Sequence, residues 1–103
     1  MKFAMRPPGP AYRRLQKQVA ALGWICPGSV QRRRQLGTRK LRHPIYQWTR
    51  KVKGKTVTVK LTADQYQGLR IAIAHQRRLT RLIAALQKLT IVALFKAQRQ
   101  PPN

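Results

Sequence analysis

The chain has 103 residues and carries 23 lysines and arginines against one acidic residue, for a formal charge of +22. The cations of such a chain repel one another, so the composition favours a polyanionic partner such as nucleic acid, whose phosphates release condensed counterions when they are neutralised. It also argues against metal-dependent hydrolysis, which needs several carboxylate ligands. We expect no catalytic residue, no metal and no cofactor.

The hydrophobic fraction of 43% is too high for a disordered basic tail, so part of the chain is predicted to fold. We expect a flexible proline-rich basic arm over residues 1–10, a single small domain over residues 11–97 and a disordered tail over residues 98–103. No signal-peptide core and no run of about 18 apolar residues is present, which favours a cytoplasmic protein without a membrane segment.

The first predicted element is a short helix over residues 11–22, where Leu15, Val19 and Leu22 recur at helical spacing and Gly23 provides a stop. Residues 31–43 follow as a predicted mobile basic loop that ends at Pro44. We expect this loop to bind phosphates, with His43 beside it on a base or a phosphate. Its cations are Arg32, Arg33, Arg34, Arg39, Lys40 and Arg42.

Residues 45–61 predict a β-hairpin that turns at Lys53-Gly54. A two-residue turn pairs Trp48 with Val59 and places apolar and polar side chains on opposite faces. The apolar face holds Tyr46, Trp48, Val57, Val59 and Leu61, and we expect it to pack against a helix. The polar face holds Gln47, Thr49, Lys51, Thr56, Thr58 and Lys60. The hairpin lysines predicted to contact phosphate are Lys51, Lys53, Lys55 and Lys60.

A long helix is predicted from Ala63 to about Ala97. Thr62 and Gln65 have the spacing of a capping box, and Asp64 lies in the first turn, where the helix dipole favours an anion. At about 100° per residue, one face carries a basic spine of Arg70, Arg77, Arg81, Lys88 and Arg99. We expect Arg70, Arg77 and Arg81 to extend the nucleic-acid contacts.

The last turns of this helix are apolar almost all round, which predicts burial against something outside the helix. We therefore expect self-association or a protein partner on these turns. The interface residues would be Leu86, Leu89, Val92 and Phe95.

Three segments carry a family resemblance: Gly28-Ser29-Val30, Pro44-Ile45-Tyr46 and Gly54-Lys55-Thr56, followed by Leu61-Thr62 and the helix. They resemble a family of short uncharacterised prokaryotic proteins with a Gly-Ser-Leu start, a His-Gly-Pro-Tyr-Tyr-like beginning of a strand, a Gly-Lys-Thr hairpin and a C-terminal helix. The resemblance implies an association with mobile elements. Some members carry cysteines that suggest a metal knuckle, but residues 35–41 contain none.

Two apparent catalytic motifs are better explained otherwise. Gly54-Lys55-Thr56 lacks the upstream glycine of a P-loop and falls on a hairpin turn. Cys26 and His43 could pair as nucleophile and base, but no spare carboxylate exists to orient the imidazole.

The sequence thus predicts an α+β fold: short N-terminal helix, basic loop, β-hairpin and long C-terminal amphipathic helix. The predicted function is a non-catalytic nucleic-acid-binding subunit of a ribonucleoprotein or nucleoprotein complex. RNA is favoured over DNA, because folded RNA is recognised by shape and no helix-turn-helix or zinc-finger spacing is visible. The alternatives are a ribosomal structural protein, a DNA-binding accessory protein of a mobile element, and a cationic membrane-active helix over residues 71–95.

Overall fold

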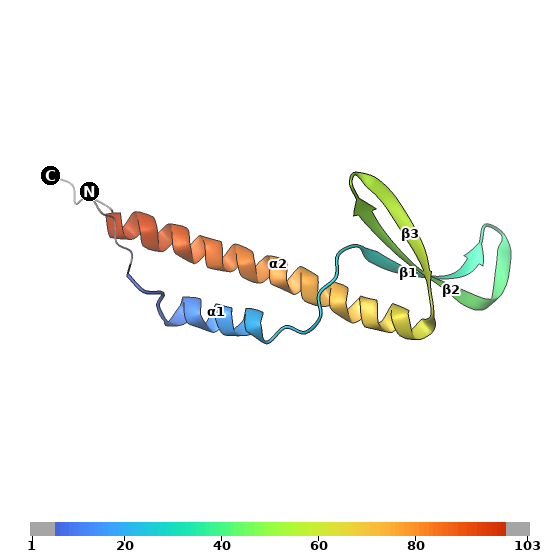
Figure 1. Ribbon diagram of the computed structural model, residues 1–103, viewed down its shortest axis with the longest axis horizontal. Helices are drawn as coiled ribbons and strands as arrows, with labels where there is room; N and C mark the ends of the chain where they lie inside the picture. The colour runs from blue at the N-terminus through green and yellow to red at the C-terminus, as the bar shows by residue number, and fades with distance from the viewer. Residues whose placement is uncertain (1–5, 99–103) are drawn as a thin grey trace. The chain divides into compact units, whose positions relative to one another are not determined.

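The computed structural model of the protein describes residues 6–98. Its elements are α1 (Pro10–Ala20), β1 (Ser29–Leu36), β2 (Arg39–Val52), β3 (Lys55–Leu61) and α2 (Ala63–Gln98) (Figure 1). This order confirms the α+β class. The described chain divides into two compact units, residues 6–22 with 78–98 and residues 23–77, and α2 contributes to both. The predictions for residues 1–5 and 99–103, Arg99 included, lie outside the described residues.

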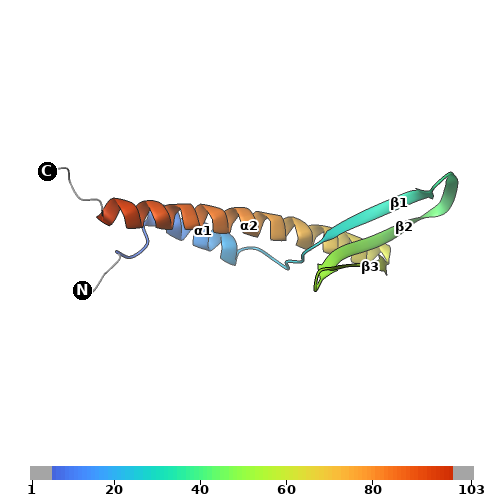
Figure 2. The ribbon, with the colours of Figure 1, turned by 90° about the horizontal axis from the view of Figure 1, so that it is seen from above.

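The first unit pairs α1 with the second part of α2, and the two helices run side by side in both views (Figures 1 and 2). Pro10 opens α1, where its missing N–H leaves no hydrogen bond unmade. Leu15 and Val19 of α1 are half-buried, while Leu82 of α2 is only 6% exposed. Arg78 Nη2 donates a hydrogen bond to Gln18 Oε1 at 2.9 Å, which links the two helices.

The second unit contains a three-stranded antiparallel sheet in the order β1-β2-β3, with β2 in the centre. The predicted hairpin register is confirmed: Trp48 pairs with Val59, and Val52 pairs with Lys55 across the turn. Lys53 and Gly54 have φ values of 49° and 80°. Two consecutive positive φ angles are typical of the hairpin turn whose twist matches the strands it joins.

The predicted mobile loop over residues 31–43 is wrong, because this segment forms most of β1 and the start of β2. The two strands meet at Gly37, where φ is 60°, and Arg32 pairs with Tyr46. The ladder is irregular beyond Arg33, and Pro44 lies within β2 at this point. Proline cannot donate to a ladder, so it is tolerated where the pairing is interrupted.

Helix α2 begins with the predicted capping box. The Thr62 amide donates to Gln65 Oε1 at 2.9 Å, and the Gln65 amide donates to Thr62 Oγ1 at 3.1 Å. Asp64 lies in the first turn, as expected for the positive end of the helix dipole. No helix in the described part of the chain is long and apolar enough to cross a membrane.

The core of the second unit lies between the sheet and the first turns of α2. Cys26, Ala72 and Ile73 are buried, and Val30, Trp48 and Leu69 pack against them. The Tyr46 and Tyr66 rings add a tilted aromatic contact, with 4.8 Å between their centroids. Trp48 and Tyr46 of the predicted apolar face therefore pack on the α2 side, as the alternation pattern predicts, whereas Val59 of the same face is 39% exposed.

Residues 23–28 cross α2 and lead into β1. The Cys26 amide donates to the Ala72 carbonyl oxygen at 3.2 Å, and His75 Nδ1 donates to the Trp24 carbonyl oxygen at 2.8 Å. Gly28 ends the crossing with a φ of 95°, and a Cβ there would collide with the Thr49 carbonyl oxygen and lie 2.8 Å from Trp48 Nε1. Only glycine, which has no side chain, can adopt this positive φ and also fit beside the Thr49 carbonyl oxygen and the Trp48 ring. We call residues 23–28 the crossing segment.

Candidate nucleic-acid interface

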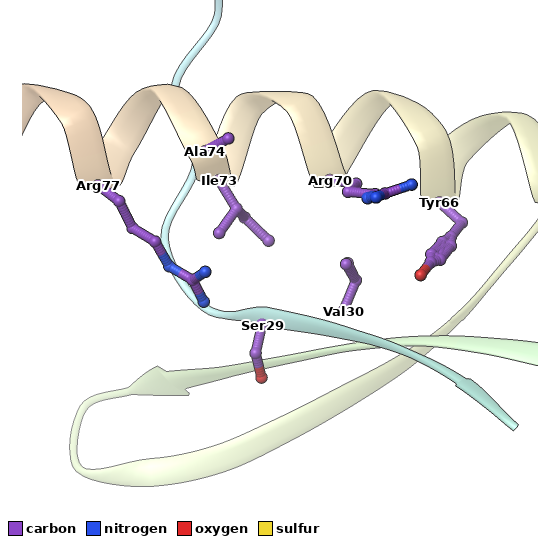
Figure 3. Close-up of a pocket in the computed structure, with 7 residues that line it drawn as sticks. All are labelled: Ser29, Val30, Tyr66, Arg70, Ile73, Ala74 and Arg77. Carbon is purple, nitrogen blue, oxygen red and sulfur yellow. The ribbon is translucent and has the colours of Figure 1, made fainter.

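Several of the predicted site residues lie together on the face of the sheet that points away from α2. Side chains alternate along each strand, so the pairing that sends Val30 and Trp48 toward α2 sends their neighbours to the other side. Figure 3 shows this alternation on β1, where Val30 points to α2 and Ser29 points away. We call this side the open sheet face; it consists of Ser29, Gln31, Arg33, Ile45, Gln47, Thr49, Lys51, Thr56, Thr58 and Lys60.

Three cations on the open sheet face, Arg33, Lys51 and Lys60, come from three different strands and are all exposed. Arg33 Nη2 donates to Gln31 Oε1 at 3.2 Å, so the guanidinium is held by an amide and not by a carboxylate. The Thr49 and Thr58 hydroxyl oxygens are 3.2 Å apart in the middle of the face. Because the chain has a single acidic residue, at the start of α2, its own carboxylates cannot neutralise this face.

A second basic surface is a groove of about 290 Å³ between β1 and α2, which we call the β1–α2 groove. Its lining residues are Val30, Tyr66, Arg70, Ile73, Ala74 and Arg77, together with Ser29, whose side chain points away from α2 (Figure 3). Arg77 extends from α2 toward β1, and Arg70 lies along the helix close to Tyr66 (Figure 3). The two arginines are seven residues apart on α2, or about 10 Å along the helix axis. Arg32 projects on the Val30 side of β1, because it pairs with Tyr46, two residues from Trp48.

The remaining predicted cations, apart from Arg81, lie at the two ends of the sheet. Residues 39–45 of β2 have no partner in β3, so the β1–β2 hairpin extends past β3 as a two-stranded ribbon. This ribbon carries exposed Arg34, Arg39, Lys40, Arg42 and His43. Lys53 and Lys55 lie at the β2–β3 turn. Arg81 belongs to the part of α2 in the other unit.

The predicted protein-interface residues divide by exposure. Leu86 and Leu89 are half-buried within the first unit. Val92 is 51% exposed and Phe95 is 69% exposed, and their neighbour Ile91 is 56% exposed. Ile71 and Ile83 of α2 are exposed as well, but Ile91, Val92 and Phe95 are neighbours within two turns near the end of the helix.

Arg50 has a place in the site region that the sequence analysis did not assign. Its guanidinium carbon lies 3.9 Å from the centroid of the Trp48 ring, on the side of the sheet that faces α2. This is cation–π geometry, and Arg50 Nη1 is buried without a hydrogen-bond partner among the described residues. The available signal was the two-residue spacing from Trp48, which puts both side chains on one face.

Residues 6–98 contain no group of three or more His, Cys, Asp or Glu side chains that could hold a metal ion. Cys26 is buried in the core, with its thiol 3.4 Å from the Pro27 carbonyl oxygen, and His43 is exposed on the β1–β2 ribbon.

Comparisons with protein-family models, with curated proteins and with solved structures found no match. The family resemblance of the hairpin and helix therefore stays a prediction. Charge and surface geometry are the basis on which a function can be proposed.

Proposed function

We propose that the protein binds nucleic acid through its phosphates, as a non-catalytic subunit of a ribonucleoprotein or nucleoprotein complex. The observation that carries this proposal is the open sheet face, where Arg33, Lys51 and Lys60 project together without a carboxylate in a chain of charge +22. A polyanion supplies the missing counter-charge and releases its own counterions on binding.

The polar groups between these cations support the same ligand. Gln31, Gln47, Thr49 and Thr58 offer amide and hydroxyl groups, which are the uncharged side-chain types that contact phosphate and sugar oxygens. Such contacts fix position without reading sequence. We propose structured RNA in preference to DNA, because an irregular RNA surface is recognised by shape and by backbone contacts.

The β1–α2 groove is proposed as a second phosphate contact. Arg70 and Arg77 have no hydrogen bond or ion pair among the described residues, although both line a concave surface. Guanidinium groups suit this role because they bind phosphate oxygens in a bidentate manner. Arg32 projects on the same side of β1 and would extend the contact along the strand.

We also propose that the exposed end of α2 holds a second copy of the chain or a protein subunit of the same complex. Ile91, Val92 and Phe95 each leave more than half of their surface in solvent. Neighbouring apolar side chains of this kind are typical of a contact surface.

The test is a titration of the protein with a folded RNA hairpin, an RNA duplex and a DNA duplex at several salt concentrations. We expect log affinity to fall linearly with log salt, with a slope of about −0.7 to −0.9 per phosphate neutralised. Binding that does not depend on salt would contradict the proposal. Co-sedimentation with ribosomes distinguishes the ribosomal alternative, and a preference for duplex DNA would favour the mobile-element alternative.

A further inference from the structure

Trp24 presents almost its whole indole ring to solvent. Its exposed fraction is 90%, the highest among the large hydrophobic residues of the described chain. The chain has one other tryptophan, Trp48. The Trp48 ring packs against the core, and its indole N–H donates to the Pro27 carbonyl oxygen at 2.9 Å. Only one of the two indoles is therefore available to a ligand.

The exposed ring is attached to a fixed section of main chain. The Trp24 carbonyl oxygen accepts a hydrogen bond from His75 Nδ1 at 2.8 Å, and two residues later the Cys26 amide donates to the Ala72 carbonyl oxygen at 3.2 Å. On the other side, Gly23 lies so close to His75 that a Cβ would be 3.1 Å from its ring carbon. The main chain around Trp24 is thus tied to α2, and the ligand need not order the backbone before it meets the ring.

We propose that Trp24 is a stacking platform for an unpaired base of the bound nucleic acid. This inference rests on the proposed function and narrows its ligand to strands with accessible base faces, such as loops, bulges or single strands. Proteins that bind single strands combine cations for the backbone with aromatic rings for the bases. A base inside a duplex already has both faces covered by its neighbours, so only an unpaired base can use the ring.

The charge of the chain favours a nucleotide as the occupant. A ligand that approaches Trp24 also meets the field of 23 lysines and arginines, which attracts a polyanion. A nucleotide suits both the exposed indole ring and the positive charge, because it joins a flat apolar base to a negative phosphate.

Three proteins test the proposal: the wild type, Trp24→Phe and Trp24→Leu. Phenylalanine keeps an aromatic ring, whereas leucine keeps apolar bulk without a π face. Each is titrated at fixed low salt with a single-stranded RNA of about 12 nucleotides, within the range of known site sizes, and with a blunt RNA duplex of equal length. Binding is followed by a labelled RNA and by tryptophan fluorescence, and circular dichroism confirms equal folding.

We expect single-stranded RNA to quench wild-type fluorescence, and we expect the quench to disappear in both variants, where Trp48 is the only reporter. Trp24→Leu should lose affinity for the single strand by roughly 5- to 150-fold, because stacking on one base contributes that much. Trp24→Phe should lose less. Duplex affinity should change less than about twofold, with an unaltered salt slope, because no charge is removed.

The proposal fails if Trp24→Leu binds the single strand as well as the wild type does, or if it weakens single strand and duplex equally. It also fails if Trp24→Leu matches Trp24→Phe, since apolar bulk alone would then suffice. In each of these cases salt-dependent binding by the wild type still supports the proposed function. Absence of any salt-dependent binding by the wild type would refute the proposed function and this inference together.

Discussion

The indole nitrogen of Trp48 lies 2.9 Å from the carbonyl oxygen of Pro27. This hydrogen bond joins the central strand of the sheet to the crossing segment, which is itself joined to α2 through the Cys26 amide and the Ala72 carbonyl oxygen. The same ring also receives the Arg50 guanidinium. One side chain thus connects the sheet, the crossing segment and the helix.

Replacing Trp48 should therefore act on folding. We expect Trp48→Ala to lower the free energy of unfolding by about 2 to 4 kcal/mol, because it removes a large, partly buried aromatic side chain and the indole N–H that donates to the Pro27 carbonyl oxygen. Trp48→Phe, which keeps a ring but not the N–H, should lose about half as much. Thermal and urea unfolding give both values. A Trp48→Ala protein that unfolds like the wild type but binds RNA poorly would mean that the ring serves the ligand instead.

Gly28→Ala should be among the most destabilising small changes in the chain. The positive φ disfavours any side chain, and the new Cβ would collide with the Thr49 carbonyl oxygen. We expect a loss of at least about 2 kcal/mol in the free energy of unfolding.

Gly68→Ala is the matched control, because Gly68 lies in α2 with nothing within 4 Å of the added Cβ. It should stabilise the helix by about 0.5 to 1 kcal/mol. Similar effects of the two substitutions on urea unfolding would contradict the close approach at Gly28.

The open sheet face is tested by Lys51→Gln combined with Lys60→Gln. Both side chains are exposed, so stability should change by less than about 0.5 kcal/mol each. The slope of log affinity for RNA against log salt should become shallower by about 1.4 to 1.8, because the variant neutralises two fewer phosphates. Arg14→Gln with Lys17→Gln on α1 removes the same charge from another surface and is the control. Equal effects of the two pairs would show that net charge matters and the face does not.

Side chains alternate between the two faces of β1, so Arg32, Arg33 and Arg34 should not contribute equally to binding. Arg33 lies on the open sheet face, whereas Arg32 projects toward the α2 side. Arg33→Gln alone should reduce the salt slope by about 0.7 to 0.9, and the triple Gln variant of Arg32, Arg33 and Arg34 by up to about three units if both surfaces contact phosphate. If the triple variant has the same salt slope as Arg33→Gln, only the open sheet face contacts phosphate. An unchanged slope in both would show that these arginines face water.

Association through the end of α2 is tested with Phe95→Asp, which places a charge on the most exposed of these apolar residues. If two copies meet there, sedimentation should show a lower mass for the variant at equal concentration, because a charge without a partner is costly in an apolar contact. Leu89→Asp should reduce stability as well, since Leu89 is half-buried in the monomer. This interface is excluded if the wild type sediments as a monomer and Phe95→Asp loses no bound protein.

Much of the fold follows from local patterns. The Lys53-Gly54 turn fixed the hairpin register, and Thr62 with Gln65 marked the first residue of α2, because both depend on nearby residues alone. Strand β1 was missed because its arginines are charged on both faces, which hides the alternation, and because its pairing depends on β2. The crossing segment and its contacts with Ala72 and His75 join residues about 50 positions apart, and no local pattern indicates them.

The same limit applies to the candidate site. The sequence placed Lys51 and Lys60 on one polar face, and the structure confirms that arrangement. It could not add Arg33 to that face or assign Arg32 to the opposite side, since both assignments require a strand that had not been recognised. The two-residue spacing of Arg50 and Trp48 is enough to predict that their side chains share a face. It does not predict that Arg50 Nη1 is buried.

The position of β1 at the sheet edge has a consequence for solubility. An edge strand offers unpaired backbone groups on which another chain can add a strand, and charged side chains prevent such pairing by mutual repulsion. Arg32, Arg33 and Arg34 place three positive charges on this edge strand, so two copies cannot align there without bringing like charges together. The residues that would attract RNA therefore also act as gatekeepers against aggregation. A glutamine-substituted edge would lose that protection, and such variants should be handled at low protein concentration.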